Sequence, residues 1–124
     1  MTDVLLIDDS LTVTLSLQSA LNLSGFAVEV AHSGQEGIDL ISQGLKPSII
    51  ITDINMPGMD GLEVIGQVRQ RLRFTPVLVL SADTSNESRQ RARELGASGW
   101  LAKPISTKDL VRVIRQLVPH LAKA

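Results

Sequence analysis

Short runs of apolar residues recur along the chain, separated by segments with helical spacing. The runs are VLLI at 4–7, III at 49–51, VLVL at 77–80 and WLA at 100–102, and an alternating segment lies at 26–31. Runs that are apolar on both faces are typical of strands buried in a parallel sheet. Because strands and helices alternate, the pattern predicts an α/β fold with a parallel sheet.

The predicted helices begin and end at residues that favour those positions. SGQE at 33–36 spells a capping box, and Gly44 is suited to end the helix that follows. The segment 61–74 carries apolar residues at helical spacing, as one buried face requires. STKD at 106–109 opens a last helix, whose apolar face is expected to contain Leu110, Ile114, Leu117 and Leu121.

The segment from Leu11 to Leu23 fits two patterns. Apolar residues at every second position up to Leu17 are typical of a strand, and Gly25 would then lie in a hairpin turn. Such a strand would be more than twice the usual length of about five or six residues. Ser10 can instead cap a helix, and Gly25 can supply its left-handed stop. We therefore predict a helix from Leu11 to Leu23.

Composition narrows the class of protein. The 124 residues, with 44% hydrophobic and 20% charged residues, predict one globular domain spanning 1–124. The net charge of -1 indicates no excess of basic residues of the kind that binds nucleic acid. The absence of cysteine excludes disulfides and thiolate metal sites. Apolar runs fall far short of the roughly 20 residues of a membrane helix, and the N-terminus lacks a signal-peptide pattern. We expect a soluble, cytoplasmic protein and a monomer.

Acidic residues follow two of the predicted strands. Asp8 and Asp9 come directly after the first strand, and Asp53 follows the run at 49–51. Parallel strands lie about 4.8 Å apart and end at one edge of the sheet, so the carboxylates can converge there. Two carboxylates about 4 Å apart repel by about 4 kcal/mol at an effective dielectric near 20. A hard divalent cation, Mg²⁺ above all, would offset this repulsion. The alternative is that the three are unrelated loop or capping residues.

A hydroxyl and an ammonium group follow the two later strands. Ser81 ends VLVLS, and Lys103 follows WLA. Each is ordinary alone, since serine often caps a turn and lysine usually faces solvent. Together with the acids they suit phosphoryl transfer, because a metal and a lysine can share the phosphoryl oxygens while a hydroxyl binds a third. The carboxylate of Asp53 would be the nucleophile and would form an acyl phosphate.

Several motifs in the expected order resemble the receiver domains of two-component response regulators, over essentially the whole chain. They are IDDS, ITDINMPGMDGLEVI, VLVLSAD and GASGWLAKP. The chain is most similar to the single-domain, chemotaxis-type receivers. This resemblance implies a flavodoxin-like (βα)5 fold, with a doubly wound parallel five-stranded sheet in the order 2-1-3-4-5.

The resemblance also implies roles for the acidic residues. Asp53 matches the phosphoacceptor, which takes a phosphoryl group from a histidine kinase or phosphotransfer protein. Asp9 matches the direct Mg²⁺ ligand and Asp8 the ligand that acts mostly through water. Asn55 lies where the family supplies a backbone carbonyl to the metal. Phosphoryl lifetime is tuned at the positions of Asn55 and Asp83, and an acid at Asp83 could orient an attacking water.

Three further positions match the machinery that reads the phosphate. Ser81 resembles the hydroxyl that moves to the phosphoryl group. Lys103 resembles the ion-pair partner of the phosphoacceptor Asp53 and of its phosphate, and a cis peptide bond is expected between Lys103 and Pro104. Trp100 occupies the place of a switch aromatic that is most often Tyr or Phe. Trp is larger than Tyr or Phe and moves less freely between buried and exposed positions. We therefore expect the phosphorylation chemistry more strongly than a change of the Trp100 rotamer.

The implied output is altered protein binding at one surface, formed by the helix at 85–95, the strand of Trp100 and the helix that begins near Ser106. The helix at 85–95 has little apolar content, as elements that switch often do. The target is a downstream protein, of which a flagellar motor switch is one option, and no enzyme activity is expected beyond self-phosphorylation from small donors and self-dephosphorylation.

Other interpretations stay open. The chain could be a receiver domain excised from a larger hybrid or multidomain regulator, or a degenerate receiver that serves only for interaction. A Mg²⁺-dependent phosphohydrolase with an aspartyl nucleophile is chemically close, but it usually carries a second acid where this chain has Asn55. A flavodoxin-like nucleotide binder is disfavoured, because the acids of IDDS would repel a phosphate.

Overall fold

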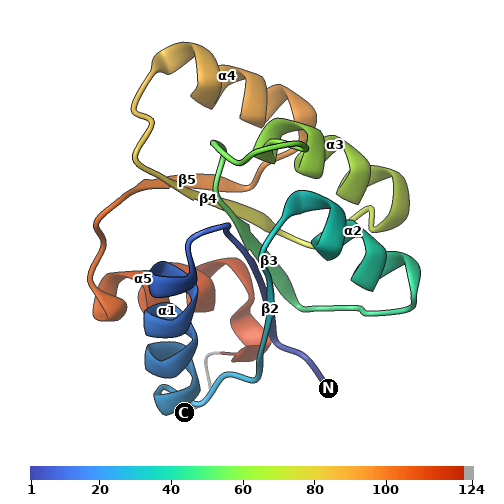
Figure 1. The fold of residues 1–124 in the computed structure, drawn as a ribbon. Coiled ribbons are helices and arrows are strands. Elements are labelled where there is room, and N and C mark those ends of the chain that lie inside the picture. Colours follow the sequence, from blue (N-terminus) through green and yellow to red (C-terminus); the bar gives the residue numbers. More distant parts are fainter. Residues whose placement is uncertain (122–124) are drawn as a thin grey trace.

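The computed structural model describes residues 1–121, which form a five-stranded parallel sheet flanked by helices (Figure 1). The strand order is β2-β1-β3-β4-β5, as predicted. The elements in chain order are β1 Val4–Ile7, α1 Leu11–Leu23, β2 Val28–Ala31, α2 Gly34–Ser42, β3 Ile49–Thr52, α3 Gly61–Arg71, β4 Val77–Ser81, α4 Asn86–Leu95, β5 Gly99–Ala102, α5 Thr107–Leu117 and the 3-10 turn η1 Pro119–Leu121.

Helices cover both faces of the sheet, and each face has its own core. α1 and α5 lie on one side, and α2, α3 and α4 lie on the other (Figure 1). The three central strands β1, β3 and β4 are buried along their whole length, which explains why they are apolar on both faces. No helix among residues 1–121 is long and apolar enough to span a bilayer.

The segment with two possible patterns is a helix, α1, with the predicted bounds. Ser10 caps it, since its side-chain oxygen accepts a hydrogen bond from the N–H of Val13 at 3.2 Å. Gly25 follows the helix with a φ of 99°, the left-handed conformation that glycine adopts without strain. The apolar residues of this segment therefore lie on two sides of the helix. Leu21 is on the buried side, and Leu15 is on the exposed side.

Two helix ends differ from the prediction. α3 ends at Arg71, before the expected position 74, and Leu72 is already extended. Thr75 precedes a proline, which disfavours helix there, and the carbonyl of Leu72 bonds to a side chain of α3. The last helix ends at Leu117, and Leu121 lies in η1. Pro119 has no N–H to continue the helical hydrogen bonds, so the apolar face is shared between two elements.

Candidate phosphorylation site

Strand register brings the candidate residues to one edge of the sheet. Ile7 of β1 is level with Thr52 of β3, so Asp8 and Asp53 leave their strands side by side. The N–H of Asp53 donates to the carbonyl of Ile7 at 3.1 Å, which fixes this alignment one residue beyond the strands. At the other side of β3, Ser81 ends β4, and its carbonyl accepts a hydrogen bond from the N–H of Lys103 at 3.0 Å.

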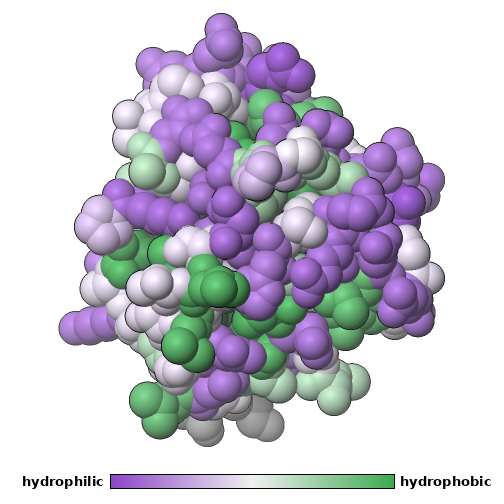
Figure 2. Space-filling model, viewed as in Figure 1, coloured by the Kyte–Doolittle hydropathy of each residue, from purple (hydrophilic) through white to green (hydrophobic). Residues whose placement is uncertain are grey.

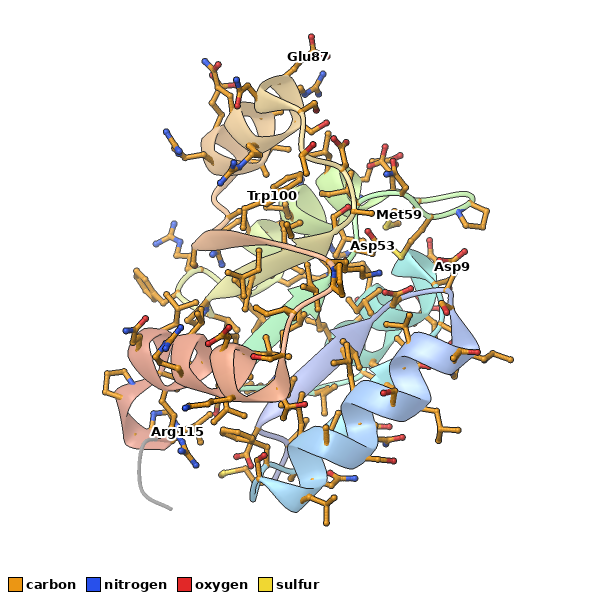
Figure 3. The ribbon with its side chains drawn as sticks, turned by 90° about the vertical axis from the view of Figure 1, so that its left-hand side faces the viewer. Asp9, Asp53, Met59, Glu87, Trp100 and Arg115 are labelled. Carbon is orange, nitrogen blue, oxygen red and sulfur yellow. The ribbon has the colours of Figure 1, made fainter. Side chains whose placement is uncertain are left out.

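The three predicted acids converge. Asp8, Asp9 and Asp53 each offer a carboxylate oxygen, and these oxygens lie within 4.8 Å of one another. Asp8 is buried, with 3% of its surface exposed, whereas Asp9 is exposed and Asp53 is half-buried. Figure 3 shows Asp9 and Asp53 near the same edge of the sheet. Oxygen ligands at this spacing suit a hard cation such as Mg²⁺, so the donor set fits the metal that the sequence predicts.

Lys103 lies between two of these acids. Its Nζ is 2.7 Å from Oδ2 of Asp8 and 3.1 Å from Oδ2 of Asp53. Burial alone would lower the pKa of Lys103, but the hydrogen bonds and negative charges of the two aspartates outweigh it and raise the pKa. The sequence indicated a pairing with Asp53 and gave no sign of the shorter bond to Asp8.

Backbone N–H groups hold the carboxylates in place. Oδ1 of Asp53 accepts a hydrogen bond from the N–H of Ile54 at 2.7 Å, and Oδ1 of Asp8 accepts one from the N–H of Ser10 at 3.0 Å. Each carboxylate therefore has one oxygen bound to backbone and the other to Lys103. α3 begins directly beside this site, because the N–H of Gly61 donates to the carbonyl of Ile54 at 2.9 Å.

Ser81 is near the site but is engaged elsewhere. Its side chain is fully buried, and its Oγ accepts a hydrogen bond from the N–H of Asp83 at 3.1 Å. The carboxylate of Asp83 in turn accepts hydrogen bonds from the N–H of Ser85 at 2.8 Å and from Oγ of Ser88 at 2.9 Å. These bonds, that of the Ser85 N–H above all, hold the pKa of Asp83 below its ordinary value. The family resemblance suggests that Asp83 could orient an attacking water, and it does not single out Ser88.

The remaining candidates lie around this edge. Asn55 is exposed two residues after Asp53, and its backbone role toward a metal stays a prediction. The peptide bond from Lys103 to Pro104 is cis, as the resemblance implied. Trp100 is half-buried on β5 and packs against the core on the α3 and α4 side (Figure 3). Among residues 1–121, its Nε1 is buried without a hydrogen-bond partner.

A family model described as the response regulator receiver domain matches residues 4–115. The chain belongs to this family. Response regulator MprA of Mycobacterium avium is 36% identical over 115 residues, covering 93% of this chain and 50% of that protein. The chain thus spans about half the length of the curated relatives it matches.

Solved structures agree with this assignment. Chemotaxis protein CheY4 of Vibrio cholerae is 35% identical and aligns over 94% of this chain and 98% of its own, with a TM-score of 0.88. A CheY-like receiver domain protein of Methanospirillum hungatei has a TM-score of 0.92 at 23% identity, over 99% of this chain and 98% of its own, which shows the shared fold. This chain is therefore a response regulator receiver domain, a class of domain that acts in phosphorylation-dependent signalling and is distinct from conventional enzymes.

Proposed function

We propose that Asp53 accepts a phosphoryl group from a phosphohistidine of a histidine kinase or phosphotransfer protein. A carboxylate oxygen of Asp53 attacks phosphorus, a P–O bond forms, the P–N bond breaks, and the imidazole leaves with the electron pair of that bond. The observation that carries this proposal is the convergence of Asp8, Asp9 and Asp53 around the ammonium of Lys103.

Each residue of the site has a separate part in this reaction. Asp8 and Asp9, with Asp53 and the backbone carbonyl of Asn55, would hold Mg²⁺, which supplies neutralisation of the phosphoryl oxygens when bound. The Ile54 N–H keeps the Asp53 carboxylate in one orientation. Lys103 already contacts Asp53 and would follow the added negative charge, about -1.5 to -2 on a phosphoryl group, onto its oxygens.

Labelling by a small phosphodonor tests the proposal. The protein is incubated with acetyl phosphate and Mg²⁺, and intact mass spectrometry follows the addition of one phosphoryl group. We expect labelling of the natural chain, none of Asp53→Asn, and none when the metal is chelated. Absence of labelling in the natural chain would favour a degenerate receiver, and sustained turnover of a simple phosphate ester would favour the phosphohydrolase.

We further propose that the signal leaves through α4, β5 and α5 as altered binding of a downstream protein. α4 supports this, since Ala92 is its one buried residue, so few contacts oppose its movement. Trp100 lies on β5 and is the only tryptophan of the chain, so a change in the environment of tryptophan can be assigned to this surface. The target can be a flagellar motor switch, as the likeness to a chemotaxis protein allows, or another protein.

The proposed domain is 1–124, acting as a monomer in the cytoplasm. A receiver within a larger regulator is the second candidate, favoured by relatives that are twice as long as the matched part. Asn55 and Asp83 are proposed to set the lifetime of the phosphate. An unchanged decay rate in Asp83→Ala would remove Asp83 from that role, and its bonds to Ser85 and Ser88 already give it a structural one.

A further inference from the structure

The C-terminal end of α4 is held firmly to the rest of the protein. Nε and Nη2 of Arg69 donate to the carbonyl of Gly96 at 3.2 and 2.8 Å, and Nη1 donates to the carbonyls of Leu72 and Thr75 at 3.1 and 2.6 Å. Gly96 ends α4 with a φ of 110°, and a Cβ there would lie 2.8 Å from Nε of Arg69. One guanidinium thus joins the end of α4 to the end of α3 and to the segment before β4.

The N-terminal end of α4 is attached in a different way. It is linked to the phosphorylation site through the chain of hydrogen bonds from Ser81 to Asp83 and from Asp83 to Ser85 and Ser88. Between the two ends α4 buries little, and hydrophilic residues cover it in the space-filling view (Figure 2). The helix is therefore fixed at its C-terminal end by Arg69 and held at its N-terminal end by a few hydrogen bonds that pass through Asp83.

We propose that the bond between Ser88 and Asp83 is a latch, which holds the start of α4 against Ser81 until Asp53 is phosphorylated. The C-terminal end of α4, which is bound by Arg69, then stays in place while the N-terminal end of the helix moves. This inference rests on the proposed function of Asp53. It makes Ser88 a positioning residue, since it acts on the reaction through Asp83 and Ser81.

The hydrogen bonds couple the latch to the use of Ser81. The hydroxyl oxygen of Ser81 is fully buried and is held by the N–H of Asp83. To bond a phosphoryl oxygen, Ser81 must turn away from that N–H, and the segment that carries Asp83 must follow or lose its partner. Because the carboxylate of Asp83 is bonded to Ser88, its displacement pulls on the first turn of α4 or breaks the latch.

Removing the Ser88 hydroxyl tests the latch without removing the helix cap. In Ser88→Ala the cap remains, because Oγ of Ser85 accepts from the backbone N–H of residue 88. Loss of one such bond favours the open form about fivefold. We expect hydrogen exchange at residues 83–88 of the unphosphorylated protein, and the labelling rate with acetyl phosphate, both to rise about fivefold.

Three comparisons complete the experiment. Ser88→Thr retains a hydroxyl and should stay close to the natural rates, and Ser19→Ala, an exposed serine of α1, should match the natural chain. Exchange at residues 92–97 should not change in Ser88→Ala, because that end is held by Arg69. A merely structural role for Ser88 would slow labelling or leave it unchanged, whereas the latch requires that labelling becomes faster.

The possible failures are distinguishable. If the natural chain is not labelled at all, the proposed function of Asp53 fails, and exchange at residues 83–88 still tests the hydrogen bond. If the natural chain is labelled and Ser88→Ala is labelled no faster, the latch is refuted while the proposed function stands. Faster exchange with an unchanged labelling rate also refutes the latch, because it separates the start of α4 from the reaction.

Discussion

Replacing Lys103 with methionine should make the protein less stable without metal and should tighten its binding of Mg²⁺. The ammonium of Lys103 lies 2.7 Å from Asp8 and 3.1 Å from Asp53, so it neutralises the same carboxylates that would hold the cation. Methionine keeps much of the length and apolar stem of the side chain, so the change removes mainly the charge and its hydrogen bonds.

The magnitudes follow from burial and distance. Asp8 is 3% exposed, and breaking a buried pair by removing one partner costs about 3 kcal/mol or more. A lysine about 4 Å from a divalent ion repels it by about 2 kcal/mol even at the dielectric of water, twice the value for two unit charges. Since about 1.4 kcal/mol corresponds to a factor of ten, the Kd for Mg²⁺ should fall at least about tenfold in Lys103→Met.

Two measurements check this reasoning. Urea denaturation with a chelator gives the free energy of unfolding, and calorimetric titration gives the Kd for Mg²⁺. Lys108→Met is the matched control, because Lys108 is an exposed lysine in the first turn of α5 and forms no ion pair within residues 1–121. A Kd that is unchanged or higher in Lys103→Met would refute the view that lysine and metal compete for the acids.

Other changes should alter stability in opposite directions. Arg69→Met should cost about 2–3 kcal/mol in urea denaturation, because three carbonyls lose their donor, while exposed Arg73→Met should change stability by less than about 0.5 kcal/mol. Gly61→Ala should cost about 3 kcal/mol, since a Cβ there would overlap the backbone carbonyl of Asp53. Gly66→Ala meets open space within a helix and should gain about 1 kcal/mol. Equal effects of the two substitutions would contradict this. The raised pKa of Lys103 makes its contribution to stability complete below about pH 10.5 and lost as pH rises through the higher, folded-state pKa. The difference in unfolding free energy between the natural chain and Lys103→Met should therefore stay constant up to about pH 10.5 and shrink above it.

The strands and the acidic cluster could be predicted because each depends on local pattern and on one rule of topology. A run such as VLLI is buried on both faces, and parallel strands end at a common edge, so Asp8 and Asp53 were expected at the same edge of the sheet. The start of α1 at Leu11 was equally local, because Ser10 caps it. The strand order came from the resemblance to the receiver family, and periodicity alone would not have given it.

The contacts that join distant segments could not be predicted in the same way. Nothing near Lys103 in sequence indicates that Asp8 is its closer partner, since 95 positions separate the two residues. Arg69 looks like a surface residue near the end of a helix, yet it bonds to the carbonyl of Gly96. Ser88 lies three residues after the capping Ser85, so the sequence indicates that its backbone N–H binds the cap. Only the fold shows that its side-chain hydroxyl binds the carboxylate of Asp83.

The charges of the site explain why phosphorylation would rearrange it. Three carboxylates and one ammonium leave two negative charges, which one divalent cation would neutralise. Transfer to Asp53 would replace its single charge with the charge of about -1.5 to -2 that a phosphoryl group carries, so the site would become more negative even with the cation bound. Lys103 and the hydroxyl of Ser81 are the groups at this edge that can move toward the added charge. In that movement Lys103 would leave Asp8 and Ser81 would leave the N–H of Asp83, so the proposed response would pass to the segment that starts α4.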